Sequence, residues 1–473
     1  MATVVFEING QTVIVNDVDP HCTLLEWLRA SGRTGSKEGC AEGECGACAV
    51  ALLGRGADGR ARFEAVNSCL VSLPEVHGRS VVSVEGLAAA DAPLHPVQQA
   101  LIETGGSQCG YCTPGFVMSL FAEYYRRDRS GYDPEAISGN LCRCTGYRPI
   151  VDAARLLGPP APGDRWLAEL DTELEPLLGL DYAANGRRFL RPESLAGVFD
   201  ALERHPGAVL LGGGTDLMVY ANQRHARYPA LVSLAAVPEL NSIDWRDDEV
   251  VIGAALPLAQ LEHALSAEHA GELRVLRELL PLFSSRLIRN RATLGGNLGT
   301  ASPIGDSPPA LLALDATLTL ASRAGTRRTT LASFFLDYRK TALAPGEVIL
   351  SVHMPRPAPR LQRFYKVSKR VLDDISSVAG AFALDLDAAG RVERLAIAYG
   401  GVAATPLRAS ALERLAIGKP WDEGTLRLLR EAARELGTPL SDHRASADYR
   451  RAMLGSLLER FFWETSGRAE AAE

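Results

Sequence analysis

Four cysteines near the N-terminus constrain this chain more than any other feature of its sequence. Three of them follow one another at the spacing C-x4-C-x2-C in the stretch KEGCAEGECGAC, and the fourth comes after 20 further residues. Glycines between them let the backbone turn tightly and bring its N–H groups close to the sulfur atoms. We therefore expect the thiols to converge on one loop, and they are Cys40, Cys45, Cys48 and Cys69.

This spacing is the ligand pattern of a plant-type two-iron, two-sulfur (2Fe-2S) cluster, which four thiolates hold. A zinc ribbon would need two C-x2-C pairs about 15 to 20 residues apart, and here a single such pair faces the lone Cys69. Disulfides suit short secreted chains, whereas this chain has 473 residues. The sequence therefore predicts a 2Fe-2S site formed by these four residues.

Composition excludes several classes of function. The chain is 47% apolar and 23% charged, which is typical of a globular protein of about three domains. Its net charge of −7 argues against nucleic acid as a partner, because nucleic-acid-binding proteins normally carry a clustered basic face. The one basic run, Arg126, Arg127 and Arg129, is interpreted as a solvated helix end. No signal peptide and no long apolar segment is evident, so we expect a cytoplasmic protein with no membrane partner. Cys22 lies outside every ligand group and is expected to be a free, buried thiol.

The first domain is expected over residues 1–85, as a β-grasp ferredoxin. Residues 3–15 alternate as strands do around Asn9-Gly10, a strong hairpin signal, and Thr23 with Glu26 forms a capping box that opens a helix. Further strands are expected at 48–53 and 63–66, and the segment after Cys69 leads to a last one near 81–84.

The second domain, residues 86–157, changes to helical periodicity. Helices are expected to begin at Pro96 and after Thr113 as N-cap, and Asp133-Pro134-Glu135 should open another. The domain carries a second cysteine group with the pattern C-x2-C, 29 residues, C-x-C. Two cysteines one residue apart cannot both point from one face of a helix, so this group should lie on a loop at a helix end. By spacing alone it is a metal site whose metal stays open, formed by Cys109, Cys112, Cys142 and Cys144.

A family resemblance assigns that metal. A ferredoxin pattern followed by C-x2-C and then C-R-C-T-G-Y resembles the paired 2Fe-2S domains of the molybdenum hydroxylases, the xanthine dehydrogenase and aldehyde oxidase group. The resemblance implies a second 2Fe-2S cluster, in a helical bundle that faces a molybdenum cofactor, with the ferredoxin-like cluster facing a flavin. It also implies that Gln108 and Cys144 lie close to the pterin of a neighbouring domain or chain.

The pattern turns to α/β beyond a linker at residues 158–185, and residues 186–358 are expected to form one domain. A strand at 209–211 runs into Gly212-Gly213-Gly214-Thr215-Asp216, and a second glycine-rich turn occurs at 293–297. Each could be only a tight turn, and neither is a Rossmann fingerprint. Together with Asp306 they resemble the FAD-binding domain of the same family. The resemblance implies that FAD contacts Leu210, Leu211, Gly212, Gly213, Gly214, Thr215, Asp216, Leu217, Phe283, Thr293, Leu294, Gly295, Gly296, Asn297, Asp306, Ile349 and Lys366; Phe283 could equally be an ordinary core aromatic.

Residues 359–473 resemble the small C-terminal flavoprotein domain of the family, with two strands followed by amphipathic helices. The stretch FYKVSKRVLDDISSV resembles the family segment that passes the reactive edge of the flavin, where Asp373 or Asp374 would influence the acceptor, NAD. The alternative is a solvated loop pair, and the usual acidic residue before the pair is Leu372 here. The expected fold class is therefore multidomain α+β, with a β-grasp 2Fe-2S domain, a helical-bundle 2Fe-2S domain, an α/β FAD-binding domain and a small α+β flavoprotein domain.

The function implied by the resemblance is electron transfer. A partner molybdopterin subunit would oxidise hypoxanthine or xanthine to urate, and this chain would pass the electrons through two 2Fe-2S clusters to FAD and then NAD. No molybdenum domain follows within the sequence, so we expect a separate large subunit and an (αβ)2 heterotetramer. Alternatives are the same role in a hydroxylase of aldehydes or N-heterocycles, a stand-alone NADH-linked reductase, and a zinc-stabilised interaction module without redox function.

Overall fold

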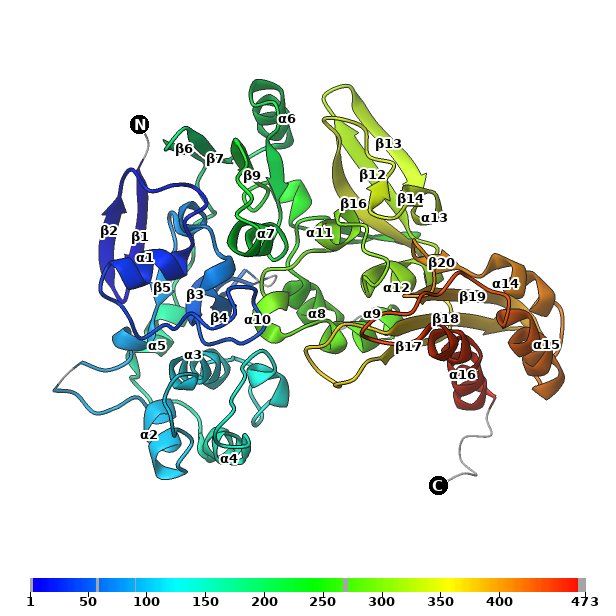
Figure 1. The fold of residues 1–473 in the computed structure, drawn as a ribbon, viewed down its shortest axis with the longest axis horizontal. Coiled ribbons are helices and arrows are strands. Elements are labelled where there is room, and N and C mark those ends of the chain that lie inside the picture. The colour runs from blue at the N-terminus through cyan, green and yellow to red at the C-terminus, as the bar shows by residue number, and fades with distance from the viewer. Residues whose placement is uncertain (1–2, 57–58, 90, 267–270, 467–473) are drawn as a thin grey trace. The chain divides into compact units, whose positions relative to one another are not determined.

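A computed structural model describes residues 3–56, 59–89, 91–266 and 271–466 (Figure 1). The chain forms two compact units. The first comprises Met1–Asn241 with two later segments, Pro257–Gln260 and Ser284–Ala292. The second comprises Ser242–Leu256, Leu261–Phe283 and Thr293–Glu473. No helix of the described residues is both long and apolar enough to cross a membrane.

The N-terminal sheet of the first unit has five strands in the order β2-β1-β5-β3-β4, with β1 and β5 parallel and the other pairs antiparallel. Asn9 and Gly10 both adopt positive φ, of 55° and 78°, which matches the twist of a two-residue hairpin and confirms the predicted turn. The predicted capping box of Thr23 and Glu26 is also present, at the start of α1. The elements are β1 (Val4–Ile8), β2 (Gln11–Val15), α1 (Leu24–Ala30), β3 (Ala49–Arg55), β4 (Ala61–Asn67) and β5 (Ser80–Val82).

Helices α2 (Pro96–Glu103), α3 (Thr113–Tyr124), α4 (Arg148–Leu156) and α5 (Arg165–Leu170) follow this sheet. Helix α3 packs against β3, and an aromatic cluster that includes Phe63, Phe121 and Trp166 fills the core between sheet and helices. Helix α5 lies inside the predicted linker, where the buried Trp166 and Leu170 fix it to this core. Thr113 is not the N-cap of α3, because the helix already includes it and Cys112 takes the cap position.

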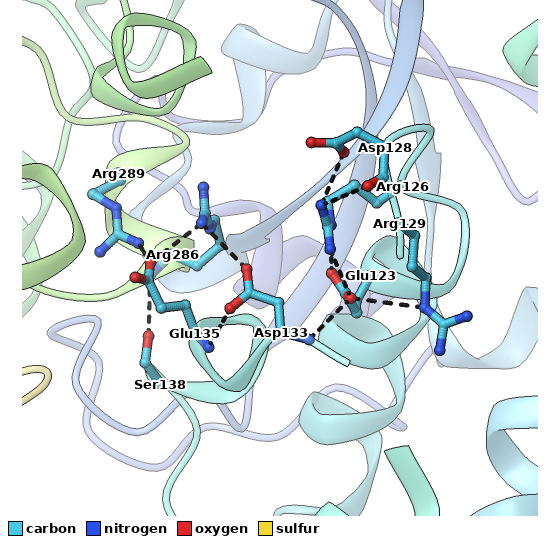
Figure 2. Close-up of polar contacts among 9 residues, drawn as sticks. All are labelled: Glu123, Arg126, Asp128, Arg129, Asp133, Glu135, Ser138, Arg286 and Arg289. Carbon is cyan, nitrogen blue, oxygen red and sulfur yellow. Dashed lines mark hydrogen bonds and ion pairs between the residues drawn. The ribbon is translucent and has the colours of Figure 1, made fainter. Parts of the chain in front are cut away.

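The prediction of a helix after Asp133 is also wrong. Asp133 does accept a hydrogen bond from the Glu135 N–H, but only a 3-10 turn forms, η4 (Pro134–Ile137). This turn instead contacts α10 (Arg286–Arg289), a short helix in the segment Ser284–Ala292 of the first unit. Glu135 receives ion pairs from Arg286 and Arg289 there, as Figure 2 shows.

The basic run after α3 is bonded rather than simply solvated (Figure 2). Arg126 and Arg129 both form ion pairs with the buried Glu123, at 2.8 Å and 3.7 Å. Arg129 also donates to the carbonyls of Leu157 and Gly158 at the end of α4. The arginines therefore tie the helical elements to one another, which the sequence did not indicate.

A second sheet of the first unit has the order β6-β7-β9-β8, with β9 parallel to both β7 and β8. Strand β8 ends at Leu211, and the glycine-rich stretch Gly212–Asp216 connects it to α7. Leu231 and Leu211 pack with the core of the N-terminal sheet in one hydrophobic cluster. The elements are β6 (Leu180–Ala184), β7 (Arg187–Arg191), α6 (Leu195–Arg204), β8 (Val209–Leu211), α7 (Leu217–Gln223) and β9 (Ala230–Ser233).

The second unit contains a five-stranded antiparallel sheet, a two-stranded hairpin of β14 and β15, and a four-stranded antiparallel sheet. The five-stranded sheet has the order β10-β11-β16-β12-β13. The helices and strands of this stretch of the chain are β10 (Ile243–Trp245), β11 (Glu249–Gly253), α8 (Leu258–Ser266), α9 (Arg274–Leu279), α11 (Leu294–Gly299), α12 (Ser307–Ala313), β12 (Thr317–Ser322), β13 (Gly325–Thr330), α13 (Leu331–Phe334), β14 (Phe335–Asp337), β15 (Lys340–Thr341) and β16 (Val348–Pro355). The first three residues of α8 belong to the first unit.

The four-stranded sheet has the order β17-β18-β19-β20, and α14, α15 and α16 follow it in the chain (Figure 1). Phe382 of β18 stacks on Phe461 of α16 with ring centroids 5.1 Å apart, so the long C-terminal helix closes the core on this sheet. The elements are β17 (Leu361–Val367), β18 (Val378–Leu386), β19 (Val392–Gly400), β20 (Leu407–Arg408), α14 (Ser410–Ala416), α15 (Glu423–Ala433) and α16 (Ala447–Thr465).

Candidate functional site

Cys40, Cys45 and Cys48 of the first group lie on a loop between α1 and β3 that has no regular secondary structure, and Cys69 lies in the 3-10 turn η1 (Ser68–Leu70) after β4. The loop turns through left-handed backbone at Ala41, Gly43 and Gly46, with φ of 55°, 87° and 63°. A Cβ on Gly39 would lie 2.7 Å from the Cys45 sulfur, so this position has room only for glycine. The loop therefore folds tightly around the sulfur atoms.

The thiols of this group lie as two hydrogen-bonded pairs, Cys40 with Cys45 and Cys48 with Cys69. The hydrogen bond from Cys45 lowers the pKa of Cys40 to about 5, although burial opposes this shift. Hydrogen bonds from the backbone N–H groups of Glu42, Cys45 and Glu44 lower the pKa further. The Gly43 N–H donates to Cys69, whose own bond to Cys48 and burial nevertheless raise the pKa of that thiol. Backbone N–H groups directed at sulfur stabilise thiolates, the form that binds iron, so the loop fits a 2Fe-2S cluster.

The second cysteine group also lies as two pairs. The sulfur atoms of Cys109 and Cys144 are 3.2 Å apart, and Cys112 bonds Cys142. The C-x-C segment lies on a loop just before α4, at a helix end as predicted. Cys109 and Cys144 are exposed, whereas Cys142 is buried.

The paired arrangement holds for both groups. Among the described residues, no three or more His, Cys, Asp or Glu side chains are arranged to hold a single metal ion. A 2Fe-2S cluster takes two protein ligands on each of its two irons. Four thiols in two pairs are therefore chemically suited to it.

The backbone joins the two cysteine groups directly. The N–H of Leu141, the residue before Cys142, donates to the Cys45 carbonyl at 3.0 Å, and the Asn140 side chain donates to the Gly46 carbonyl. A Cβ on Gly46 would lie 2.3 Å from the Gly139 carbonyl oxygen, so the two segments touch through main chain. A single hydrogen bond therefore links the backbone beside Cys142 of the second group with the backbone of Cys45 of the first.

In the first unit, the stretch Leu210–Leu217 runs from β8 through the glycines into α7. Gly214 has φ of 77°, and a Cβ on Gly213 would lie 1.8 Å from the Arg291 carbonyl oxygen. Such close approach is possible only without side chains. Arg291 in turn donates to the Gly213 carbonyl and pairs with Glu75, so a charged residue holds the loop in place.

In the second unit, the stretch Thr293–Asn297 is a helix start rather than a tight turn. The Thr293 side chain caps α11 by accepting from the Gly296 N–H. Gly295 packs against the Ala254 carbonyl, 2.6 Å from where a Cβ would lie. The expectation of a turn was wrong because the threonine cap lets a glycine-rich sequence begin a helix.

A buried ion pair lies close to this helix. Lys366 donates to Asp306 and to the Leu282 carbonyl, each at 2.8 Å, and Ser376 donates to the other Asp306 oxygen. Ser307 next to Asp306 donates to Asn297. The predicted residues Asn297, Asp306 and Lys366 are thus brought together by short polar contacts.

The remaining flavin candidates of this unit have ordinary packing positions. Ile349 is buried on β16, and Phe283 is half-buried after the 3-10 turn η6 (Leu280–Leu282). Phe283 directly follows Leu282, whose carbonyl accepts from Lys366. A glycine-rich backbone beside a buried charged pair suits a polar, chain-like group such as the ribityl diphosphate of FAD.

The acceptor candidates lie on the loop between β17 and β18. Asp373 is buried and has φ of 50°, so it is not part of a solvated pair. Burial raises the pKa of Asp374, but donation from the Arg370 and Ile375 N–H groups outweighs it and leaves that pKa below its usual value. Asp374 therefore stays charged on this loop.

Sequence reasoning missed several residues of these sites. Ser376 holds Asp306, Arg291 holds Gly213, and Asn222 donates to two carbonyls of the first cysteine group. Each of these contacts joins residues at least 70 positions apart. No local spacing or periodicity marks such residues.

Four family models match the chain in succession. They are a 2Fe-2S iron-sulfur cluster binding domain over residues 6–73 and a [2Fe-2S] binding domain over 83–155. An FAD binding domain in molybdopterin dehydrogenase follows over 183–357, and a CO dehydrogenase flavoprotein C-terminal domain over 363–465. The chain therefore has two 2Fe-2S domains, an FAD-binding domain and a C-terminal flavoprotein domain, as the resemblance implied.

The curated relatives include xanthine dehydrogenases along the whole chain. That of Emericella nidulans is 33% identical over 99% of this chain and 39% of its own length. Xanthine dehydrogenase 2 of Arabidopsis thaliana is 34% identical over 88% of this chain and 36% of its own length. Aldehyde oxidase 2 of Cavia porcellus is 32% identical over 97% and 38%. The chain thus spans about two fifths of the length of these relatives.

Two solved structures share the fold of more than half of this chain. Carbon monoxide dehydrogenase from Hydrogenophaga pseudoflava has 28% identity and a TM-score of 0.54, covering 57% of this chain and 94% of that one. Quinoline 2-oxidoreductase from Pseudomonas putida 86 has 28% identity and a TM-score of 0.54, covering 59% and 96%. With the four domains in this order and relatives along its whole length, the chain belongs to the molybdenum hydroxylase family.

Proposed function

We propose that this chain is the electron-transfer subunit of a xanthine dehydrogenase. A partner molybdopterin subunit oxidises hypoxanthine and xanthine to urate, and the electrons pass through the two cysteine sites of this chain to FAD and then to NAD. The clusters supply single-electron transfer, and the flavin links it to a two-electron acceptor. We further propose an (αβ)2 heterotetramer as the assembly.

The observation that carries this proposal is the set of relatives. Xanthine dehydrogenases of fungi, plants and insects are 33–34% identical to this chain over 88–100% of its residues. A chain with two 2Fe-2S domains and an FAD domain in the same order is expected to use them for the same transfer.

The geometry of the first unit supports the proposed order of transfer. Cys109 and Cys144 are exposed, so an electron donor on another chain or domain can approach them. The Leu141–Cys45 hydrogen bond connects that site to the next one. From there, α7 connects the first cysteine group to the end of the flavin stretch, because Asn222 bonds the Cys69 carbonyl.

The test begins with the protein purified together with whatever accompanies it. Iron, sulfide, flavin and molybdenum are quantified, and about four irons and one FAD per chain are expected, since each cluster holds two irons. Molybdenum should appear only when a large partner chain is present, and that preparation should reduce NAD with xanthine. Folded protein without iron and flavin would refute the proposal.

A second candidate is the same electron-transfer role with a different substrate. Aldehyde oxidase 2 of Cavia porcellus is almost as similar to this chain as the xanthine dehydrogenases, and quinoline 2-oxidoreductase shares its fold. The same preparation should then oxidise an aldehyde or an N-heterocycle faster than xanthine. A stand-alone reductase is distinguished by NADH oxidation that does not require any copurifying large chain.

A further inference from the structure

Two amide side chains at the end of α7 bind the first cysteine group from outside the ferredoxin domain. The Asn222 side-chain nitrogen donates to the Ala41 carbonyl at 2.9 Å and to the Cys69 carbonyl at 2.8 Å. Gln223 donates to the Cys40 carbonyl at 2.7 Å. Asn222 thus uses both of its N–H groups to cross-link two ligand segments that lie 28 positions apart in the chain.

The bond to Ala41 has a consequence on the other side of the peptide plane. In a trans peptide the C=O of one residue and the N–H of the next point in opposite directions. The Ala41 carbonyl faces Asn222, and the Glu42 N–H correspondingly bonds the Cys40 sulfur. Asn222 therefore holds the outer end of a peptide dipole whose inner end donates to a thiol.

The same arrangement occurs a second time in this loop. The buried Asn67 donates to the Gly43 carbonyl at 3.0 Å, and the Glu44 N–H on the opposite side of that peptide bonds Cys40. Two side-chain amides thus direct two backbone N–H groups at one sulfur atom. Asn67 belongs to the ferredoxin domain, whereas Asn222 comes from the segment that follows the flavin stretch.

The peptide held by Asn222 needs this support. Ala41 has φ of 55°, a left-handed conformation that is unfavourable for a residue with a Cβ. Around the site, Met218 and Ala221 of α7 pack with Cys48 and Cys69 in one hydrophobic cluster. Hydrogen bonds in such an apolar environment are stronger and polarise one another.

We propose that Asn222 is a positioning residue that raises the reduction potential of the cluster bound by Cys40, Cys45, Cys48 and Cys69. It does so by fixing the Ala41–Glu42 peptide, so that the Glu42 N–H donates to Cys40. This inference rests on the proposed function, because it requires a 2Fe-2S cluster at that site.

The direction of the effect follows from charge. A reduced cluster carries one more negative charge than an oxidised one, so N–H donors at sulfur stabilise the reduced form more. Removing the Asn222 amide weakens one such donor. We expect the equilibrium constant for reduction to fall about threefold to tenfold, where tenfold corresponds to about 59 mV for a one-electron couple.

The experiment is a redox titration of the purified full-length protein, followed by electron paramagnetic resonance, which gives separate signals for the two clusters. The variant Asn222→Leu removes the donors at similar size. The second cluster, with ligands Cys109, Cys112, Cys142 and Cys144, is an internal control. Asn241→Leu is a matched control variant, since the Asn241 side-chain nitrogen also donates to two backbone carbonyls, those of Leu234 and Val237.

We expect Asn222→Leu to lower the potential of the first cluster alone, with both potentials unchanged in Asn241→Leu. If Asn222→Leu loses the first signal, Asn222→Ser, which retains one donor, is titrated in its place and should show a smaller downward shift. An unchanged potential in the variant that is titrated overturns the inference while leaving the proposed function intact. Wild-type protein without iron or sulfide would overturn both.

Discussion

At the scale of single residues, His95 shows how burial gives an ordinary side chain a pH-dependent effect. Its Nδ1 accepts from the Val97 N–H and caps α2, so this nitrogen must stay unprotonated. Its Nε2 lies 2.9 Å from the Tyr125 hydroxyl, which donates to Asp164. Burial, opposed by the charge of Asp164 and aided by that of Arg165, lowers the pKa of His95 to about 4.

This depressed pKa predicts an acid-sensitive first unit. Because the unfolded value is 6.5, the unfolded chain binds more protons between pH 6.5 and about 4. The free energy of unfolding is therefore highest above pH 6.5 and declines as the pH falls toward about 4, by a total of about 3 kcal/mol. His95→Asn keeps a capping side chain but removes the titration, so the thermal midpoint should depend less on pH between 5 and 7.

The matched control is His443→Asn, because His443 is exposed. This variant should keep the pH dependence of the wild-type protein. If His95→Asn keeps it as well, the titration of another group is responsible and the role assigned to His95 is wrong.

The residues that could be predicted from sequence have partners nearby in the chain or belong to a marked spacing of cysteines. The capping box of Thr23 and Glu26 spans three positions and Cys40 and Cys45 lie five apart, whereas the more distant cysteines are marked by their residue type and spacing. Asn222, Arg291 and Ser376 act across long separations, through contacts that exist only once the chain has folded. Their residue types are common on any surface, so the sequence carries no signal for them.

At the scale of elements, the segment after Asp133 shows why a correct local signal can give a wrong element. Asp133, Pro134 and Glu135 are the residues that open a helix, and the cap hydrogen bond does form. The segment ends after one 3-10 turn because Gly139 and Asn140 must meet the Gly46 backbone of the cysteine loop. Close main-chain contact with a distant segment therefore overrides the local propensity.

The Glu135 carboxylate should be essential to this junction (Figure 2). It faces Arg286 and the fully buried Arg289, whose side chain is 0% exposed. Removing one partner of a buried ion pair costs about 3–5 kcal/mol. Glu135→Ala should therefore lower the free energy of unfolding of the first unit by about 3 kcal/mol, measured by urea denaturation.

Asp152→Ala provides the comparison for this prediction. Asp152 pairs with Arg155 at 3.9 Å on the surface of α4, where both side chains are more than half exposed. Such pairs contribute about 0–1 kcal/mol. Equal effects of the two substitutions would show that the buried junction is no more important than a surface pair. Hydrogen exchange should also increase in α10 for Glu135→Ala and not for Asp152→Ala.

At the scale of the whole molecule, the order of the domains could be predicted because each carries its own local signature. Two cysteine spacings, a change from strand to helix periodicity and two glycine-rich stretches appear in sequence order, and family models match each part. The assignment of each flavin contact could not be predicted from pattern alone, since Leu210–Leu217 and Thr293–Asn297 lie in different units of the fold.

Serial electron transfer makes a prediction that involves the whole chain. Cys45→Ser and Cys112→Ser each remove one predicted ligand from one cysteine group and leave the other group intact. Each variant should keep about two of the four irons of the wild-type protein, because a serine oxygen replaces a thiolate that the cluster needs. The proposed function places the two sites in series, so both variants should stop reduction of the flavin by the substrate of the proposed partner subunit.

Reduction of the flavin by NADH, the proposed acceptor end of the path, distinguishes a variant that has lost a cluster from one that has lost its fold. In the proposed function NADH reduces the flavin directly, so both variants should still show rapid flavin bleaching by NADH in a stopped-flow experiment. Cys22→Ser is the control, since Cys22 lies outside both groups, and it should retain iron content and transfer in both directions. A Cys45 or Cys112 variant with full turnover would show that its site is not on the path between the substrate and the flavin.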